Sequence, residues 1–272
     1  MHIVPAGRSQ DFITDWYLWH GQREAELAAP YSWLSLTGIH WFTLDPDLIV
    51  PSFPGTWHRD GEGVEYVPDP ARPVLVDARP AEGPTQVLPY ESGAPTKIWA
   101  GAVQAELILR GGTFAVRTRD PASAPRAAFR GVPHFPVAPS WDVPAEFESV
   151  KAPTDVEVDA VVAGVSHHKA VIGRLHFRLA GEEQSLLVFQ TNGAGPSILF
   201  RDPTNGDTTY GAGRFLYLRT NDPAAFTRVD FNRAVNPPCA FSQHCTCPLP
   251  PPQNTLTVPV TAGETLPGPS AS

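Results

Sequence analysis

The chain has 272 residues, of which 42% are hydrophobic and 18% are charged, and this composition is typical of a packed core and excludes a disordered chain. Its 31 prolines and 22 glycines favour many turns and short strands over long helices. The formal net charge is −8 and no cluster of Lys and Arg is present, which argues against nucleic acid as a partner.

The first residues and the cysteine content predict a cytoplasmic protein. The start, MHIVPAGRSQDFITDW, lacks the basic and apolar regions of a signal peptide. No apolar run approaches the ~20 residues that cross a bilayer, so no membrane partner is expected. The three cysteines fall between positions 239 and 247, unlike the spread framework of a disulfide-rich secreted protein.

The first predicted region is an N-terminal helix region over residues 1–30, with the helix itself expected over residues 9–28. Trp16 and Trp19 fall roughly on one face, and Pro30 ends the helix. This pattern favours a helix that lays its two tryptophans on a sheet.

From Trp33 onward the apolar residues recur with period two, which predicts strands. Gly111-Gly112 separates two such runs and predicts a hairpin. We expect a β-sandwich half over residues 31–120, followed by a linking segment over 121–141 that is rich in Pro, Ala and Arg. The expected strands are 33–42, 63–68, 74–78, 85–90, 97–109 and 113–119.

A second β-rich half is predicted over residues 142–265, with a flexible tail over 266–272. The fold class is therefore all-β, with an N-terminal helix, a β-sandwich half and a second, β-barrel-like half. The expected strands of the second half are 155–164, 171–180, 184–191, 197–201, 213–219, 226–232 and 255–260.

Several unusual stretches are shared with a known family: YSWLSLTGIHWF at 31–42, YGAGRFLY at 210–217, and DFNRAVNPPCAF with CPLPPPQN at 230–254. With these motifs the chain resembles the bacterial domain-of-unknown-function family numbered 1684. The resemblance implies no activity. The first half is also somewhat similar to a forkhead-associated sandwich, but FTLDPD at 42–47 lacks the Arg and Ser or Asn donors that a phosphopeptide needs.

The cysteine cluster allows three interpretations. Zinc would need four ligands, and the candidates Cys239, His244, Cys245 and Cys247 have the spacing C-x5-C-x-C rather than CxxC knuckles. A catalytic thiol would need His244 as its base. Packing of a proline-rich loop by small buried thiols is favoured, so no cofactor is predicted and zinc stays an alternative.

Polar residues around positions 210 and 230 are the better candidates for a site. In a strand, Asp230 and Asn232 share a face, and such groups either satisfy loop backbone or hold a polar ligand. Arg214 suits a bidentate pair with a ligand carboxylate or with Asp207 or Asp230, and the internal salt bridge is favoured. The full set of candidate ligand-binding residues is Tyr210, Arg214, Asp230, Asn232, Arg233 and Asn236.

We therefore expect a soluble binding module for a small polar or anionic ligand, with a pocket in the second half. Two alternatives stay open. The first is an enzyme, hydrolytic or metal-assisted, that uses Asp230 or a histidine in the same pocket as a general base. The second is a protein-interaction module that uses sheet edges and exposed aromatic residues such as Trp141.

Overall fold

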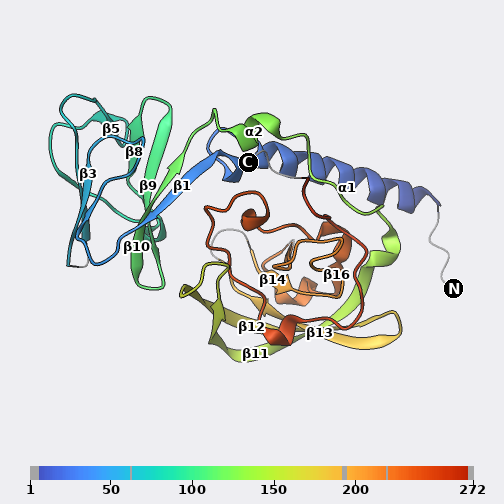
Figure 1. The fold of residues 1–272 in the computed structure, drawn as a ribbon. Coiled ribbons are helices and arrows are strands. Elements are labelled where there is room, and N and C mark those ends of the chain that lie inside the picture. The colour runs from blue at the N-terminus through green and yellow to red at the C-terminus, as the bar shows by residue number, and fades with distance from the viewer. Residues whose placement is uncertain (1–5, 62, 192–194, 219, 269–272) are drawn as a thin grey trace. The chain divides into compact units, whose positions relative to one another are not determined.

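The computed structural model describes residues 6–61, 63–191, 195–218 and 220–268 (Figure 1), so residues 269–272 of the predicted tail lie outside it. The chain forms two compact units. Unit 1 comprises the described parts of Met1–Ala25, Arg130–Phe241 and Thr246–Ser270, and unit 2 comprises the described parts of Glu26–Phe129 with Ser242–Cys245.

Unit 2 is a sandwich of two antiparallel sheets, as the period-two pattern predicts. The six-stranded sheet has the order β1-β10-β9-β8-β5-β6, and the four-stranded sheet has the order β2-β3-β4-β7. The strands are β1 (Leu36–Trp41), β2 (Asp47–Leu48), β3 (Thr56–Asp60), β4 (Gly63–Val67), β5 (Leu75–Val76), β6 (Arg79–Pro80), β7 (Thr85–Gln86), β8 (Lys97–Ala100), β9 (Val103–Arg110) and β10 (Thr113–Arg119). The helical turns are η1 (Trp33–Ser35), η2 (Tyr90–Ser92) and the short α2 (Ala124–Ala128), which falls in the predicted linking segment.

Side chains from both sheets form one hydrophobic core in unit 2. Trp57 and Tyr66 contribute from the smaller sheet, and Ile98, Leu107 and Val116 contribute from the larger one, all fully buried. This confirms the predicted sandwich, whereas the likeness to forkhead-associated domains stays a prediction.

The Gly-Gly hairpin is present, since Arg110 pairs with Thr113 across the turn between β9 and β10. The single strand predicted over 97–109 is wrong, because the chain turns at Gly101, whose positive φ of 60° suits a residue without a side chain, and then continues as a second strand.

Unit 1 begins with helix α1 (Ala6–Leu27), which starts three residues earlier than predicted. Trp16 is 1% exposed, and its indole N–H donates to the Asn232 carbonyl at 2.6 Å. Trp19 packs against a buried cluster that includes Phe189 and Val235. Trp19 therefore lies against sheet residues, as predicted, whereas Trp16 is held by a hydrogen bond to the turn at Asn232.

The sheet of unit 1 is antiparallel and has the order β15-β14-β13-β12-β11-β16. It confirms the predicted second β-rich half and has the form of an incompletely closed barrel. The strands are β11 (Asp142–Asp159), β12 (Ser166–Leu179), β13 (Glu182–Phe189), β14 (Ser197–Phe200), β15 (Arg214–Tyr217) and β16 (Arg228–Asp230). The short turns of the chain's second half are η3 (Pro139–Trp141), η4 (Pro223–Ala225), η5 (Phe231–Arg233), η6 (Pro238–Ala240) and η7 (Pro252–Asn254).

Two strand predictions for this unit need correction. The strand predicted over 155–164 begins at Asp142, and its first three residues also pair with β16. The segment 255–260 is not a strand, although its residues alternate between exposed and buried. Leu256 donates its N–H to the Arg201 carbonyl, and Val260 donates to the Asp202 side chain, so this segment satisfies its amides outside a regular ladder.

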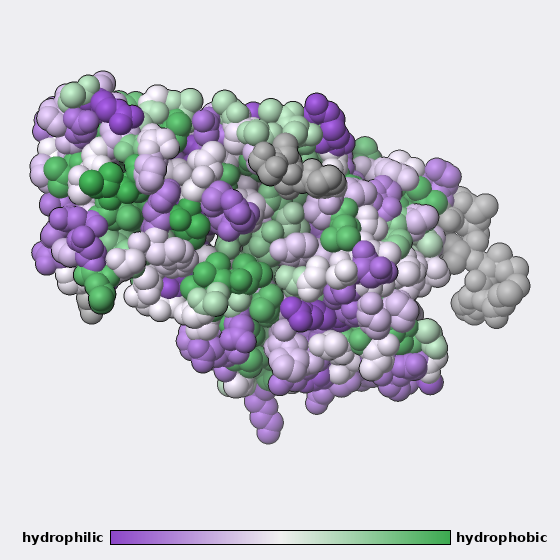
Figure 2. Space-filling view, in the orientation of Figure 1, coloured by the Kyte–Doolittle hydropathy of each residue, from purple (hydrophilic) through white to green (hydrophobic). Residues whose placement is uncertain are grey.

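The outer part of β11 carries exposed acidic residues, and Figure 2 shows a largely hydrophilic surface over β11 and β12. From Thr154 to Asp159 the described strand that pairs with β11 is β12, and the Asp159 carbonyl also accepts from the Leu249 N–H. Within the described residues, no helix combines the length and apolarity needed to span a membrane.

Candidate functional site

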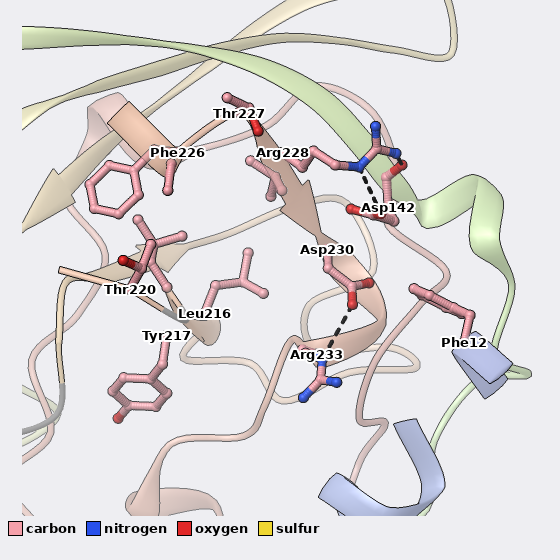
Figure 3. Close-up of a pocket in the computed structure, with 13 residues that line it drawn as sticks. Phe12, Asp142, Leu216, Tyr217, Thr220, Phe226, Thr227, Arg228, Asp230 and Arg233 are labelled. Atoms are coloured by element: carbon pink, nitrogen blue, oxygen red, sulfur yellow. Dashed lines mark hydrogen bonds and ion pairs between the residues drawn. The ribbon is translucent and has the colours of Figure 1, made fainter. Parts of the chain in front are cut away.

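A pocket of unit 1 lies where both edge strands of the curled sheet contribute side chains (Figure 3). Leu216 and Tyr217 come from β15, and Arg228, Val229 and Asp230 come from β16. The cavity has a volume of about 310 Å³. Its other lining residues are Phe12, Asp142, Leu218, Thr220, Ala225, Phe226, Thr227 and Arg233.

Two aspartates face this pocket from neighbouring strands. Asp142 of β11 and Asp230 of β16 are direct partners in the antiparallel register, so their side chains lie on the same face. Each aspartate has an arginine beside it. Arg228 Nε lies 2.7 Å from Asp142 Oδ2, and Arg233 Nε lies 3.4 Å from Asp230 Oδ2.

The end of β16 fixes the position of Asp230. The chain leaves the strand at Asp230 and turns into η5, and Asp230 Oδ1 caps that turn by accepting from the Asn232 N–H at 3.1 Å and from Asn232 Nδ2 at 2.8 Å. Asn232 therefore lies beside Asp230 through a turn, so the expectation that they share a strand face is wrong.

Asp230 ionises less readily than an ordinary aspartate. Burial raises its pKa, the hydrogen bonds from Asn232 oppose this shift, and the negative charge of Asp142 adds to it. A carboxyl with a raised pKa in a pocket marks a candidate functional site.

Arg233 is held between η5 and helix α1. Its Nη2 donates to Asp15 Oδ2 at 2.6 Å, and its guanidinium lies 4.7 Å from the centre of the Trp19 ring. The side chain is 10% exposed, so it presents one edge to the pocket while the rest is packed. Arg233, Tyr217 and Leu218 also line an adjoining hollow of about 490 Å³.

Arg214, another candidate from the sequence, is fully buried and lies outside the pocket lining. Its Nη2 lies 3.1 Å from Asp202 Oδ1 and donates to the Val260 carbonyl at 2.9 Å, and its Nη1 donates to the Ala262 carbonyl. The favoured internal salt bridge is present, with Asp202 as the partner in place of Asp207 or Asp230.

The remaining candidates bind loop backbone, which is one of the two uses that the sequence allowed. Asn232 accepts from the Ala138 N–H at 2.9 Å and donates to the Ala138 carbonyl at 3.0 Å. Asn236 donates its side-chain amide to the Thr265 carbonyl at 2.7 Å, and Tyr210 donates to the Cys239 carbonyl at 3.0 Å. The structure therefore brings Asp230 and Arg233 together in the pocket lining and places the other four in the surrounding framework.

Comparison with known proteins places these elements in a family. Residues 127–265 match the family model described as "Protein of unknown function (DUF1684)". The chain belongs to this family. Except for Phe12, every residue that lines the pocket falls within the matched range, whereas the resembling stretch at 31–42 lies outside it.

A solved relative is an uncharacterised protein of Haloarcula marismortui, determined by solution NMR. It is 31% identical over 52% of this chain and 78% of its own length, with a TM-score of 0.43. A search of curated proteins finds no match.

The cysteines of the DUF1684 region are thiols without disulfide bonds. Cys245 and Cys247 are buried, Cys239 is partly exposed, and burial lowers the pKa of His244. In the described part of the chain, no three His, Cys, Asp or Glu side chains converge in a way that could hold a metal ion.

Sequence reasoning missed Asp142 and Arg228 as lining residues of the DUF1684 pocket. Asp142 fell just after the predicted linking segment, 13 positions before the strand predicted to start at residue 155. Arg228 was detectable, because it is two positions before Asp230 and so shares its face of the strand.

Proposed function

We propose that unit 1 binds a small molecule in this pocket and that the ligand has an apolar body and a neutral polar head group. The observation that carries the proposal is the pair of Asp230 and Arg233 at one wall of a cavity (Figure 3) that is also lined by apolar residues, namely Phe12, Leu216, Leu218, Ala225, Phe226 and Val229. A few polar groups on an apolar lining are typical of small-molecule sites.

The charges favour a neutral polar head group over an anionic one. Each arginine at the pocket already faces an aspartate, and Asp142 and Asp230 would repel a bound anion. A carboxylate beside a guanidinium offers an acceptor and a donor together, which matches a group such as a carboxamide that carries both. Of the two ligand classes expected from the sequence, the neutral polar class is therefore better supported.

The volume of the pocket supports a ligand whose apolar part is about the size of one ring. Its volume of about 310 Å³ is at the lower end of the range for small-molecule pockets, about 300–1,000 Å³. Leu216 and Phe226 provide apolar surface for such a body, and Thr220 and Thr227 add hydroxyl groups at the rim.

The described lining contains no Ser, Cys or His, so it supports binding over catalysis by a Ser–His or Cys–His pair. As part of this proposal, we place the protein in the cytoplasm with neither nucleic acid nor membrane as its partner. The net charge and the clustered thiols support that setting.

Three probes with the same ring test the proposal: benzamide, benzoate and benzylammonium. Backbone amide chemical shifts of the full chain should change on titration with benzamide around residues 216–218 and 225–230, with a Kd of about 1 mM. Benzoate and benzylammonium should bind at least about tenfold more weakly, because each lacks either the donor or the acceptor.

The variant Asp230→Asn should weaken benzamide binding about tenfold, because an acceptor oxygen facing the probe is lost. Asp155→Asn is the matched control, since Asp155 is an exposed aspartate of β11 and lies outside the pocket lining. Stronger binding of benzoate than of benzamide, or shifts confined to other parts of the chain, would contradict the proposed ligand class.

A further inference from the structure

Two of the three cysteines meet at the base of the proline-rich loop. Cys239 lies in η6 of unit 1, and the chain returns to it at Cys247 of the same unit. The Cys239 N–H points to Cys247 Sγ at a distance of 3.2 Å. Cys247 is 6% exposed, whereas Cys239 is partly exposed to solvent.

The surroundings of Cys239 favour its thiolate. The hydrogen bond with the Cys247 thiol lowers the pKa of Cys239, burial opposes this shift, and the Tyr210 hydroxyl supports it. Tyr210 also donates to the Cys239 carbonyl at 3.0 Å, so it fixes the turn that carries the thiol. A partly exposed thiol with a lowered pKa and a second thiol beside it has the features of a redox-sensitive cysteine.

We propose that Cys239 and Cys247 form a peroxide-reactive pair, in which Cys239 is oxidised first and Cys247 then closes a reversible disulfide. The contact between the Cys239 N–H and Cys247 Sγ at 3.2 Å, which brings the two residues together, carries this inference, and the inference is independent of the pocket and its ligand. Under this proposal, the segment from Cys239 to Cys247 is a site of reversible oxidation.

The chemistry balances with hydrogen peroxide as the oxidant. The Cys239 thiolate attacks one peroxide oxygen, the O–O bond breaks, and the leaving hydroxide takes a proton to give water and a Cys239 sulfenic acid. Cys247 then attacks the Cys239 sulfur as a thiolate, the S–O bond breaks, and a second water forms. Two thiols are oxidised to one disulfide, one peroxide is reduced to two waters, and a dithiol reductant reverses the change.

The full chain treated with hydrogen peroxide provides the test. Intact mass should fall by about 2 Da, and the loss should be reversed by dithiothreitol. Phe241 lies between the two cysteines, so chymotrypsin separates them and a disulfide appears as a linked pair of peptides. Cys245→Ser is the matched control, because this buried neighbour of Cys247 should be dispensable for the link.

The variant Cys247→Ser should abolish the linked pair and leave a Cys239 sulfenic acid that dimedone traps. The wild-type chain gives a second measurement that does not depend on folding of a variant: iodoacetamide at neutral pH should modify Cys239 faster than Cys245. A link that involves Cys245, complete alkylation of all three thiols after peroxide, or equal modification rates of Cys239 and Cys245 would overturn the proposal.

Discussion

Two regions, the β9–β10 hairpin of unit 2 and the segment after β16 of unit 1, satisfy their main-chain polar groups in different ways. In unit 2, β9 and β10 match in unbroken register from Gln104 with Arg119 to Arg110 with Thr113. In unit 1, the chain after β16 runs through 3-10 turns and isolated bridges. Buried Arg214 binds a carbonyl group of this segment, and the buried Asn254 of the segment binds main-chain groups of β13 and β14.

Asn254 shows how a side chain replaces missing ladder bonds. Strands β13 and β14 pair at Phe189 with Ser197. Further along, Asn254 accepts from the Leu187 N–H at 2.7 Å and donates to the carbonyls of Leu187 and Leu199 at 3.1 and 2.7 Å. The asparagine of the CPLPPPQN motif thus joins two strands that have separated.

The unusual polar residues of unit 1 are therefore largely part of its framework. Arg214, Asn232, Asn236 and Asn254 are all buried, and each binds main-chain groups of a distant segment. The polar groups of the pocket, Asp230 and Arg233, lie at the margin of that framework. Mutations should therefore separate a large effect on the stability of unit 1 from a small effect at the pocket.

The largest effect is expected from Arg214→Ala. The change leaves Asp202 buried without its partner, which should lower the free energy of unfolding by about 3–5 kcal/mol. Hydrogen exchange should locate the loss in β14 and β15, with β9 and β10 unchanged. Arg178→Ala is the control, because its pair with Glu183 is exposed and should contribute about 0–1 kcal/mol. If both variants lost the same free energy of unfolding, the buried pair of Arg214 and Asp202 would not stabilise unit 1 as expected.

Asn254→Ala should have a smaller but still substantial effect. It removes the side-chain partner of the buried Leu199 carbonyl and of two partly buried main-chain groups of Leu187, at a total cost of about 2–3 kcal/mol. Urea denaturation measures the loss. Thr257→Ala, three residues along and hydrogen-bonded at the surface, should change stability by about 0.5 kcal/mol or less. If Asn254→Ala lowered the stability as little as Thr257→Ala, the strands β13 and β14 would not depend on the Asn254 side chain.

The smallest effect is a pH dependence from His20 of unit 1. Burial lowers its pKa, and the charges of Glu264 and Glu24 oppose this, while those of His134 and Arg23 add to it. Because the folded pKa lies below the unfolded value of 6.5, the stabilising contribution is complete above pH 6.5 and is lost as pH falls through the folded pKa.

This slope cannot exceed about 1.4 kcal/mol per pH unit, since one proton is involved. Urea unfolding at a series of pH values should show it in the wild type, and His20→Gln should remove it. If His20→Gln kept the wild-type slope of unfolding free energy against pH, groups other than His20 would cause the pH dependence.

Much of the architecture could be predicted because hydrophobic alternation reports burial directly. The same signal wrongly predicted a strand over residues 255–260. Leu256, Val258 and Val260 of this segment are buried and alternate with exposed residues, but the segment forms no strand. Alternation shows which side chains face a core, whereas the ladder depends on a neighbour that the local sequence does not contain. The short strands β2 and β3 were missed, since proline-rich surroundings hide their pattern.

The pocket could be predicted in part for a similar reason. Asp230 and Arg233 lie in the DFNR motif that drew attention to them. Asp142 joins Arg228 across 86 positions of sequence, through a strand pairing that local reasoning cannot supply. The inward orientation of Arg214 depends on Asp202 and on the carbonyl groups of Val260 and Ala262, which are 46 and 48 positions away in the sequence.

The arrangement of α1 has a consequence for how the protein is made on the ribosome. Arg23 of this helix pairs with Glu264, which follows it by 241 positions. At about 5–20 residues per second, the helix emerges roughly 12–50 s before its partner has been synthesised. The Asn232 carbonyl that accepts from Trp16 is also synthesised late, so the final docking of the helix has to follow synthesis of the C-terminal part of the unit.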